Sequence, residues 1–210
     1  MIISWYGQTC VRIQNPHINI LIDPFGKSAG IRPPRTGGTD ILLVSEPSMI
    51  PSGDSPAFSV DGPGEYERQG IYIKGICPTS DQKAKKKEDI IPTLYILEAE
   101  GVRIAHFNLS SEISDKDIEA FGEVDILFLV VGSGSRFLDG GAASRVVRAI
   151  EPKIVIPMGY AIPGLKIKLD KVDGFLKAMG AGKVSPIPKA VLKKKDLAGE
   201  ETKVIVLKPV

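Results

Sequence analysis

Hydrophobic residues in the first half of the chain occur in short runs that end at Gly, Pro, Asn or Asp. Runs of this kind are typical of β-strands. They predict strands at residues 2–6, 11–14, 18–23, 40–45, 58–60, 70–76, 93–99 and 102–107. Because helical spacing is scarce before residue 110, we expect this half to form mainly antiparallel sheet.

The second half of the chain alternates between helical and strand patterns. Ser114 and Asp117 have the spacing of a capping box, and Gly122 is a typical helix stop. The pattern predicts helices at residues 114–122, 140–152 and 169–180, the last capped by Asp170 and ended by Gly180, and strands at 124–131, 153–158 and 202–208. Together the two halves predict one α/β (α+β) domain over residues 1–210, with two mixed sheets packed face to face under helices.

Composition narrows the class of partner. Lys and Arg number 27 and Asp and Glu 25, a net charge of +2, so attraction to nucleic acid or a membrane would need a local cluster. The lysines near residues 83–87 and 193–195 lack interleaved aromatic residues, so we interpret them as solvated loops and keep nucleic-acid binding as a minor alternative. Two distant cysteines, and no apolar segment near the roughly 20 residues that span a bilayer, predict a cytoplasmic protein with no membrane partner.

Histidine is scarce, and this limits the metal chemistry. His17 and His106 are the only two in the chain. A dinuclear hydrolytic centre usually takes several imidazole nitrogens as ligands. Two histidines cannot build a His-rich centre.

Several motifs together resemble one family. They are W-x-G-x-x-C from Trp5, then "ILIDPF", "DILLVS", "GPGEYERQGIYIKGI", "EVDILFLVVG" and "VVRAIEPKIVIPM". In this order they resemble the metallo-β-lactamase superfamily, and within it the small single-domain branch related to sugar-lactone hydrolases. The resemblance implies a four-layer αββα sandwich with an active site at one edge, between the sheets. It also implies that self-association into a homo-oligomer can occur.

The resemblance locates where metal ligands would stand. In the family, the strand like residues 41–45 runs into H-x-H-x-D-H, whose side chains hold two metal ions. This chain instead has Glu46 and Ser48 at the first two histidine positions, Ile50 at the aspartate and Pro51 at the last histidine. No shift of register restores a histidine, because the stretch contains none.

The remaining ligand positions are altered as well. The third histidine position falls near Ser80, and Gln8 stands where the early G-H-x-C motif has histidine. The motif H-L-G-D-L-G appears as "HFNLSS", which keeps His106 but has at best Asn108 for the bridging aspartate, and P-M-H-Y appears with Gly159 for histidine. We therefore predict a scaffold that has lost its dinuclear metal site, with no metal and no cofactor: a pseudoenzyme.

The residues expected to line the vestigial cleft are Asp23, Glu46, Ser48, Glu65, Tyr66, His106 and Asn108. His106 is interpreted as a structural imidazole bonded to a backbone carbonyl, with a catalytic base as the alternative. Asp23 is expected to brace the loop, with a general base as the alternative. Glu65 and Tyr66 are assigned to a tight loop beside the cleft.

Two functions follow from these expectations. The first is a non-catalytic binding or scaffold protein that takes a small anionic or sugar-like ligand, or a protein partner. The alternative is a divergent hydrolase with a rebuilt or single-metal site from Glu46, His106 and Asn108, using zinc on a small ester, lactone or phosphorylated substrate. A cleft filled by Met49 and Ile50 would favour a structural role, and an open one would favour ligand binding.

Overall fold

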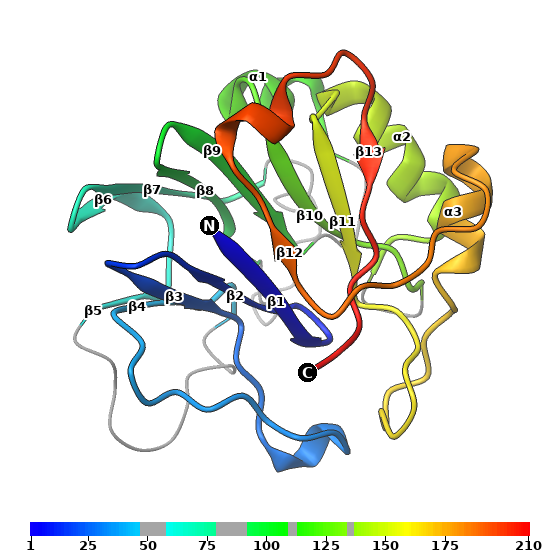
Figure 1. Cartoon of the computed structure of the whole chain (residues 1–210), viewed down its shortest axis with the longest axis horizontal. Coiled ribbons are helices and arrows are strands. Elements are labelled where there is room, and N and C mark those ends of the chain that lie inside the picture. Colours follow the sequence, from blue (N-terminus) through cyan, green and yellow to red (C-terminus); the bar gives the residue numbers. More distant parts are fainter. Residues whose placement is uncertain (47–57, 79–91, 109–112, 134–136) are drawn as a thin grey trace, which may run out of the picture.

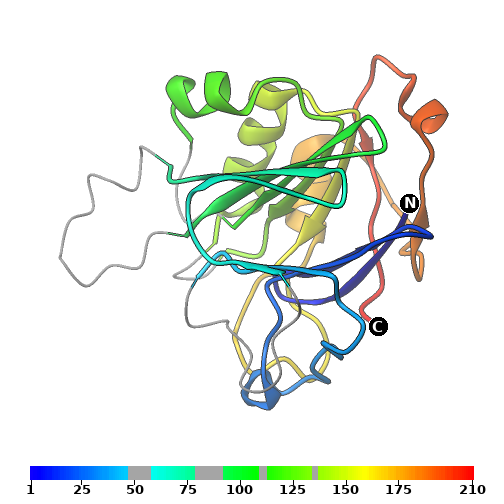
Figure 2. The ribbon, with the colours of Figure 1, turned by 90° about the vertical axis from the view of Figure 1, so that its left-hand side faces the viewer.

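Two β-sheets packed face to face make up the protein, as Figures 1 and 2 show. The computed structural model describes residues 1–46, 58–78, 92–108, 113–133 and 137–210. The strands are β1 (Ile2–Gly7), β2 (Cys10–Gln14), β3 (Asn19–Ile22), β4 (Ile41–Leu43), β5 (Phe58–Val60), β6 (Gly64–Arg68), β7 (Ile71–Ile76), β8 (Leu94–Ala99), β9 (Val102–Phe107), β10 (Ile126–Val130), β11 (Ile154–Met158), β12 (Ala190–Val191) and β13 (Lys203–Val204). The first sheet has the order β12-β1-β2-β3-β4-β5, and the second has the order β13-β11-β10-β9-β8-β7-β6.

Both sheets are mixed, as predicted, although the parallel pairs are not confined to the second half. Strands β9, β10, β11 and β13 run parallel, as expected for alternating helices and strands. In the first sheet β3, β4 and β5 are also parallel, but most pairs among β1–β9 are antiparallel, so the expectation of mainly antiparallel sheet in the first half is confirmed. The connection over residues 23–40 is long enough to return the chain to the same end of the sheet.

The helices lie on the outer face of the second sheet (Figure 2). They are α1 (Asp115–Phe121), α2 (Gly140–Ile150) and α3 (Asp173–Met179), with short 3-10 turns η1 (Lys27–Ala29) and η4 (Lys194–Leu197) elsewhere. In the described residues, the outer face of the first sheet is covered by η1 and by loops rather than by an α-helix. The predicted α/β sandwich is confirmed. None of the described helices is long and apolar enough to cross a lipid bilayer.

The core lies between the two sheets. In β1, Ile3 and Trp5 point inward and are buried, while their neighbours are partly or fully exposed. Strands β10 and β11 are buried at every position, as central parallel strands with both faces covered should be. The ring of Trp5 lies 4.6 Å from that of Tyr160. These contacts make a rigid frame for the strand ends.

Helix boundaries agree with the sequence at two of the three helices. The capping box of Ser114 and Asp117 is present. Helix α3, however, begins at Asp173 and not near Asp170, and its N-cap residue Val172 makes no side-chain cap hydrogen bond. The Asp170 N–H instead donates to the Gly132 carbonyl at 2.6 Å. The Asp170 carbonyl, which at an N-cap would accept the first helix bond, accepts from the Ala161 N–H at 2.8 Å, whereas Gly180 ends the helix as predicted.

Two strand predictions also need correction. The expected strand over residues 202–208 forms a ladder only at Lys203–Val204, with an isolated bridge at Leu207. The segment assigned to a tight loop contains the strand β6, which pairs with β7 over all five of its residues. Five consecutive antiparallel partners hold Glu65 and Tyr66 in extended backbone at the edge of the second sheet.

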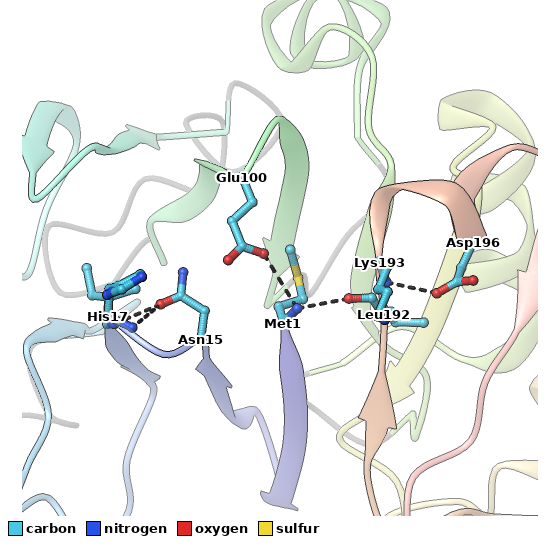
Figure 3. A network of polar contacts seen from close by, with 8 residues as sticks. Met1, Asn15, His17, Glu100, Leu192, Lys193 and Asp196 are labelled. Carbon is cyan, nitrogen blue, oxygen red and sulfur yellow. Dashed lines mark hydrogen bonds and ion pairs between the residues drawn. The ribbon is translucent and has the colours of Figure 1, made fainter.

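The sheets are tied together at the end where β1 begins (Figure 3). The Met1 amino group donates to the Leu192 carbonyl at 2.9 Å and lies 3.5 Å from a Glu100 carboxylate oxygen. Met1 precedes β1 of the first sheet, whereas Glu100 lies in the turn between β8 and β9 of the second. The opposite end, where the parallel strands finish, is where the sequence predicts the site.

Candidate functional site

Residues that follow strands of both sheets meet at one edge of the sandwich. Asp23 follows β3, Ser45 lies two residues after β4, and His106 stands near the end of β9. The Thr93 N–H, just before β8, donates to the Ser45 carbonyl at 2.9 Å and joins the two sheets there. Carboxyl ends of parallel strands are where α/β proteins usually place ligands.

Asp23 braces this edge, as predicted. It is fully buried, and its Oδ1 accepts the Ser45 N–H at 2.6 Å. Its backbone is left-handed, with φ 48°, which turns the carboxylate back toward the end of β4. Burial raises the pKa of Asp23, and this effect outweighs the lowering by His106 and by the Ser45 N–H.

His106 makes the backbone hydrogen bond that the sequence predicts. Its Nε2 lies 2.8 Å from the Thr9 carbonyl oxygen and 4.0 Å from Asp23 Oδ2. A carbonyl only accepts, so Nε2 must carry the proton and donate it. The nitrogen left for other chemistry is Nδ1, and the side chain is completely buried.

Four buried polar atoms at this edge have no hydrogen-bond partner within the described residues. They are Asp23 Oδ2, Ser45 Oγ, His106 Nδ1 and Asn108 Nδ2. The Ser45 and Thr9 hydroxyls lie close enough to lower the pKa of Asp23, but neither gives Oδ2 a hydrogen bond of normal geometry. Buried polar groups are nearly always paired, so such a cluster calls for an ordered water or a ligand.

The side chains at this edge do not fit a two-metal centre. Within the described ranges, no three His, Cys, Asp or Glu side chains are grouped so that they could hold a metal ion. His106 offers only Nδ1 as a ligand atom, and Asn108 offers an amide where a bridging carboxylate is needed. The chain has no third histidine anywhere to complete the set.

Gly159, where the family has a histidine ligand, is closely surrounded by Val130 and Phe137. This residue has φ 62°, and a Cβ built on it would lie 3.1 Å from Val130 Cγ1 and 3.3 Å from the Phe137 ring. Its N–H donates to the Gln8 carbonyl at 2.8 Å, so the backbone is also held. A histidine here would require strained backbone and displacement of Phe137.

The other predicted cleft residues are distributed unevenly. Glu46 is buried directly after Ser45, at the same edge. Glu65 is exposed on β6, and Tyr66 beside it is half-buried, with its hydroxyl donating to the Pro63 carbonyl at 3.3 Å. The positions of Ser48, Met49, Ile50, Pro51 and Ser80 lie outside the described residues. Whether Met49 and Ile50 fill the cleft stays a prediction.

Two contributors to the site were not found from the sequence. Thr9 contributes its backbone carbonyl, which has no signature in side-chain pattern. Phe137 fills the space beside Gly159, and only the fold brings these residues together. Sequence spacing carried no signal for either contact.

The chain is similar to proteins of one family. A family model described as a Beta-lactamase superfamily domain matches residues 2–159. A candidate Zn-dependent hydrolase of the metallo-β-lactamase superfamily from Thermotoga maritima is 26% identical, with a TM-score of 0.79 over 98% of this chain and 97% of that chain.

Two further structures share the fold at lower identity. Igni18, named a novel metallo hydrolase from Ignicoccus hospitalis, is 14% identical, with a TM-score of 0.66 over 99% of this chain and 95% of that one. A candidate metal-dependent hydrolase from Parabacteroides distasonis is 16% identical, with a TM-score of 0.62 over 98% and 93%. No curated protein matches the sequence.

Proposed function

Because the chain belongs to the β-lactamase superfamily, whose relatives are named as hydrolases, we propose that it is a member that acts by binding and not by metal-assisted hydrolysis. The observation that carries this proposal is the donor set at the carboxyl edge. Asn108 offers an amide where a bridging carboxylate is needed, and Gly159, packed against Phe137, stands where the family has another histidine. Activation of water by a metal ion depends on such donors.

The unpaired atoms favour a neutral, hydroxyl-bearing ligand over an anion. Asp23 Oδ2 can only accept while the carboxyl is ionised, and Asn108 Nδ2 can only donate. The bond to Thr9 fixes a proton on His106 Nε2, so in the neutral tautomer Nδ1 is an acceptor. A hydroxyl group both donates and accepts, so a sugar-like ligand or an ordered water matches this mixture. An anion would face the Asp23 carboxylate.

A single-metal hydrolase is the second candidate, supported by the naming of the Thermotoga maritima relative as Zn-dependent. Glu46 is the carboxylate that would hold the ion, because it is buried at the same edge and stands at a family ligand position. A bound zinc ion would supply a polarised water for hydrolysis of an ester, lactone or phosphorylated substrate. The two candidates differ in metal content.

Elemental analysis of protein purified without chelator tests the proposal. We expect no stoichiometric zinc, iron or manganese, and no rise in Tm on adding zinc, because a metal that does not bind the folded state cannot stabilise it. About one equivalent of metal that is lost in Glu46→Gln and kept in Glu65→Gln would overturn it. Glu65 is the matched control because it carries the same group but is exposed on β6.

A further inference from the structure

A pocket lies beside the first sheet, outside the buried polar cluster. It is a pocket of about 260 Å³ beside the turn between β1 and β2. Its walls include Tyr6, Ile31, Arg32, Ile162, Pro163 and Pro209. Tyr6 packs with the small apolar cluster on the outer side of this sheet, whereas its neighbour Trp5 points into the core. The pocket therefore lies on the Tyr6 side of β1, close to the β1–β2 turn whose Thr9 carbonyl accepts from His106.

Two loops far apart in sequence build this pocket. Residues 27–32, drawn in blue, and 160–168, drawn in yellow, lie together beside the first sheet in Figures 1 and 2. The Lys166 N–H donates to the Ala29 carbonyl at 2.9 Å and fixes one loop to the other. Gly7 allows them to approach the sheet, because a Cβ on it would lie 2.5 Å from Ile31 Cδ1 at a φ of 104°.

The two loops carry a net positive charge, because five Lys or Arg side chains outnumber Asp23, Asp40 and Asp170 at the ends of the loops. Residues 24–39 and 160–169 contain three and two Lys or Arg side chains and no Asp or Glu, in a chain whose net charge is only +2. In the described part of the chain, no ion pair involves Arg32. The local field therefore favours a negative ligand.

A buried guanidinium behind Tyr6 adds to this field. Arg12 is only 8% exposed and lies 5.5 Å from the centre of the Tyr6 ring. It donates to the Arg35 carbonyl, and its Nε has no hydrogen-bond partner within the described residues. No described carboxylate forms an ion pair with it. A buried cation without a counter-ion strengthens the attraction of an anion to the adjoining pocket.

We propose that this pocket binds a small organic anion, with its apolar body against Tyr6, Ile31 and Ile162 and its carboxylate or phosphate group at Arg32. Pockets for small molecules are mostly apolar with a few polar groups that fix orientation, and this one has that composition. The guanidinium fork suits either acid group. This inference is independent of the metal content of the buried edge.

NMR titration of the full-length protein tests the proposal, with hexanoate and hexyl phosphate as probes and hexanamide as the uncharged control. We expect backbone shifts at Gly30, Ile31 and Arg32, with Kd on the order of millimolar for so small a ligand. The stronger of the two anions identifies the acid group. Binding should weaken as salt is added.

Matched variants distinguish binding in the pocket from non-specific electrostatic attraction. Arg32→Gln should weaken anion binding about tenfold, because it removes a charge-assisted hydrogen bond. Arg35→Gln removes the same charge from the same loop but no wall of the pocket, so it should change Kd less than about twofold. Ile162→Trp should fill the pocket and abolish binding, whereas Ile167→Trp, at an exposed position of the same loop, should not.

Three results would overturn the proposal. Equal binding of hexanamide would remove the role of charge. Equal losses in Arg32→Gln and Arg35→Gln would indicate diffuse attraction and no site. Shifts with an oligoglutamate peptide but with neither small anion would assign the surface to an acidic protein segment.

Discussion

The two ends of the sandwich satisfy their polar groups in different ways. At the end where β9 begins, Arg103 donates to the Phe121 carbonyl and pairs with Glu98, and its own N–H donates to Asp125. At the end where β9 finishes, Asp23, Ser45, His106 and Asn108 each keep a buried atom with no partner among the described residues. Folding alone does not require the second arrangement, since unpaired buried groups cost stability. Asn19 and Thr39, near the starts of β3 and β4, also keep buried atoms that are unpaired within the described part of the chain, so what sets the carboxyl edge apart is that four such residues gather there.

The largest expected effect comes from restoring a histidine at this edge. Gly159→His should lower the free energy of unfolding by about 3 kcal/mol, from left-handed backbone and from overpacking against Phe137. Gly180→His is the control, because Gly180 has a similar φ of 66° but no atom within 4 Å of a built Cβ. Gly180→His should lower the unfolding free energy by about 1–2 kcal/mol, from the strain of left-handed backbone alone.

Urea denaturation of both variants measures this difference. Equal losses would mean that Phe137 moves aside without cost and that the ligand position is still open. In that event added zinc should be tested on Gly159→His directly. A rise in its Tm would point to a site that has lost few donors.

Removal of the Asp23 carboxylate should have the next largest effect. Asp23→Leu leaves the Ser45 N–H buried without its acceptor, so we expect a loss of about 2 kcal/mol in unfolding free energy. Asp23→Asn keeps an acceptor oxygen and should lose clearly less. If both variants lose the same amount, the hydrogen bond to Ser45 is not what Asp23 contributes.

The pH dependence of stability isolates the charge of Asp23. Because burial raises its pKa above the ordinary 3.8, the folded state binds this proton more tightly than the unfolded chain does. Stability from this group is therefore greatest at low pH and falls as pH rises from about 3.8 through the folded-state pKa, with a slope of at most about 1.4 kcal/mol per pH unit. Asp23→Asn should remove that slope. If the unmodified protein and Asp23→Asn change in stability with pH in the same way, the attraction of His106 offsets the effect of burial on the pKa of Asp23.

The fold was largely predictable because its signal is local. Alternating apolar positions and the capping box at Ser114 depend on neighbours in sequence, and they gave the sheets and the first helix. Asp170 failed as a cap because its carbonyl accepts a tertiary bond from the Ala161 N–H, which no local pattern encodes.

The candidate site was predictable in its residue types but not in its contacts. The sequence identifies the missing histidines and the structural roles of Asp23 and His106. It could not reveal that the partner of His106 is the Thr9 carbonyl, because 97 residues separate the two in the chain. Nor could it reveal that Phe137 fills the space beside Gly159.

The smallest expected effect tests whether the unpaired hydroxyl of Ser45 costs stability. Ser45→Ala removes a buried hydroxyl without a described partner, so the unfolding free energy should rise by up to about 1 kcal/mol. Ser114→Ala is the control, because its hydroxyl caps α1 and bonds Asp117, and it should lower the unfolding free energy by about 1 kcal/mol. Opposite signs would sharpen the contrast between the unpaired carboxyl edge and the paired cap of α1. A loss in Ser45→Ala would mean that its hydroxyl already has a water or another partner.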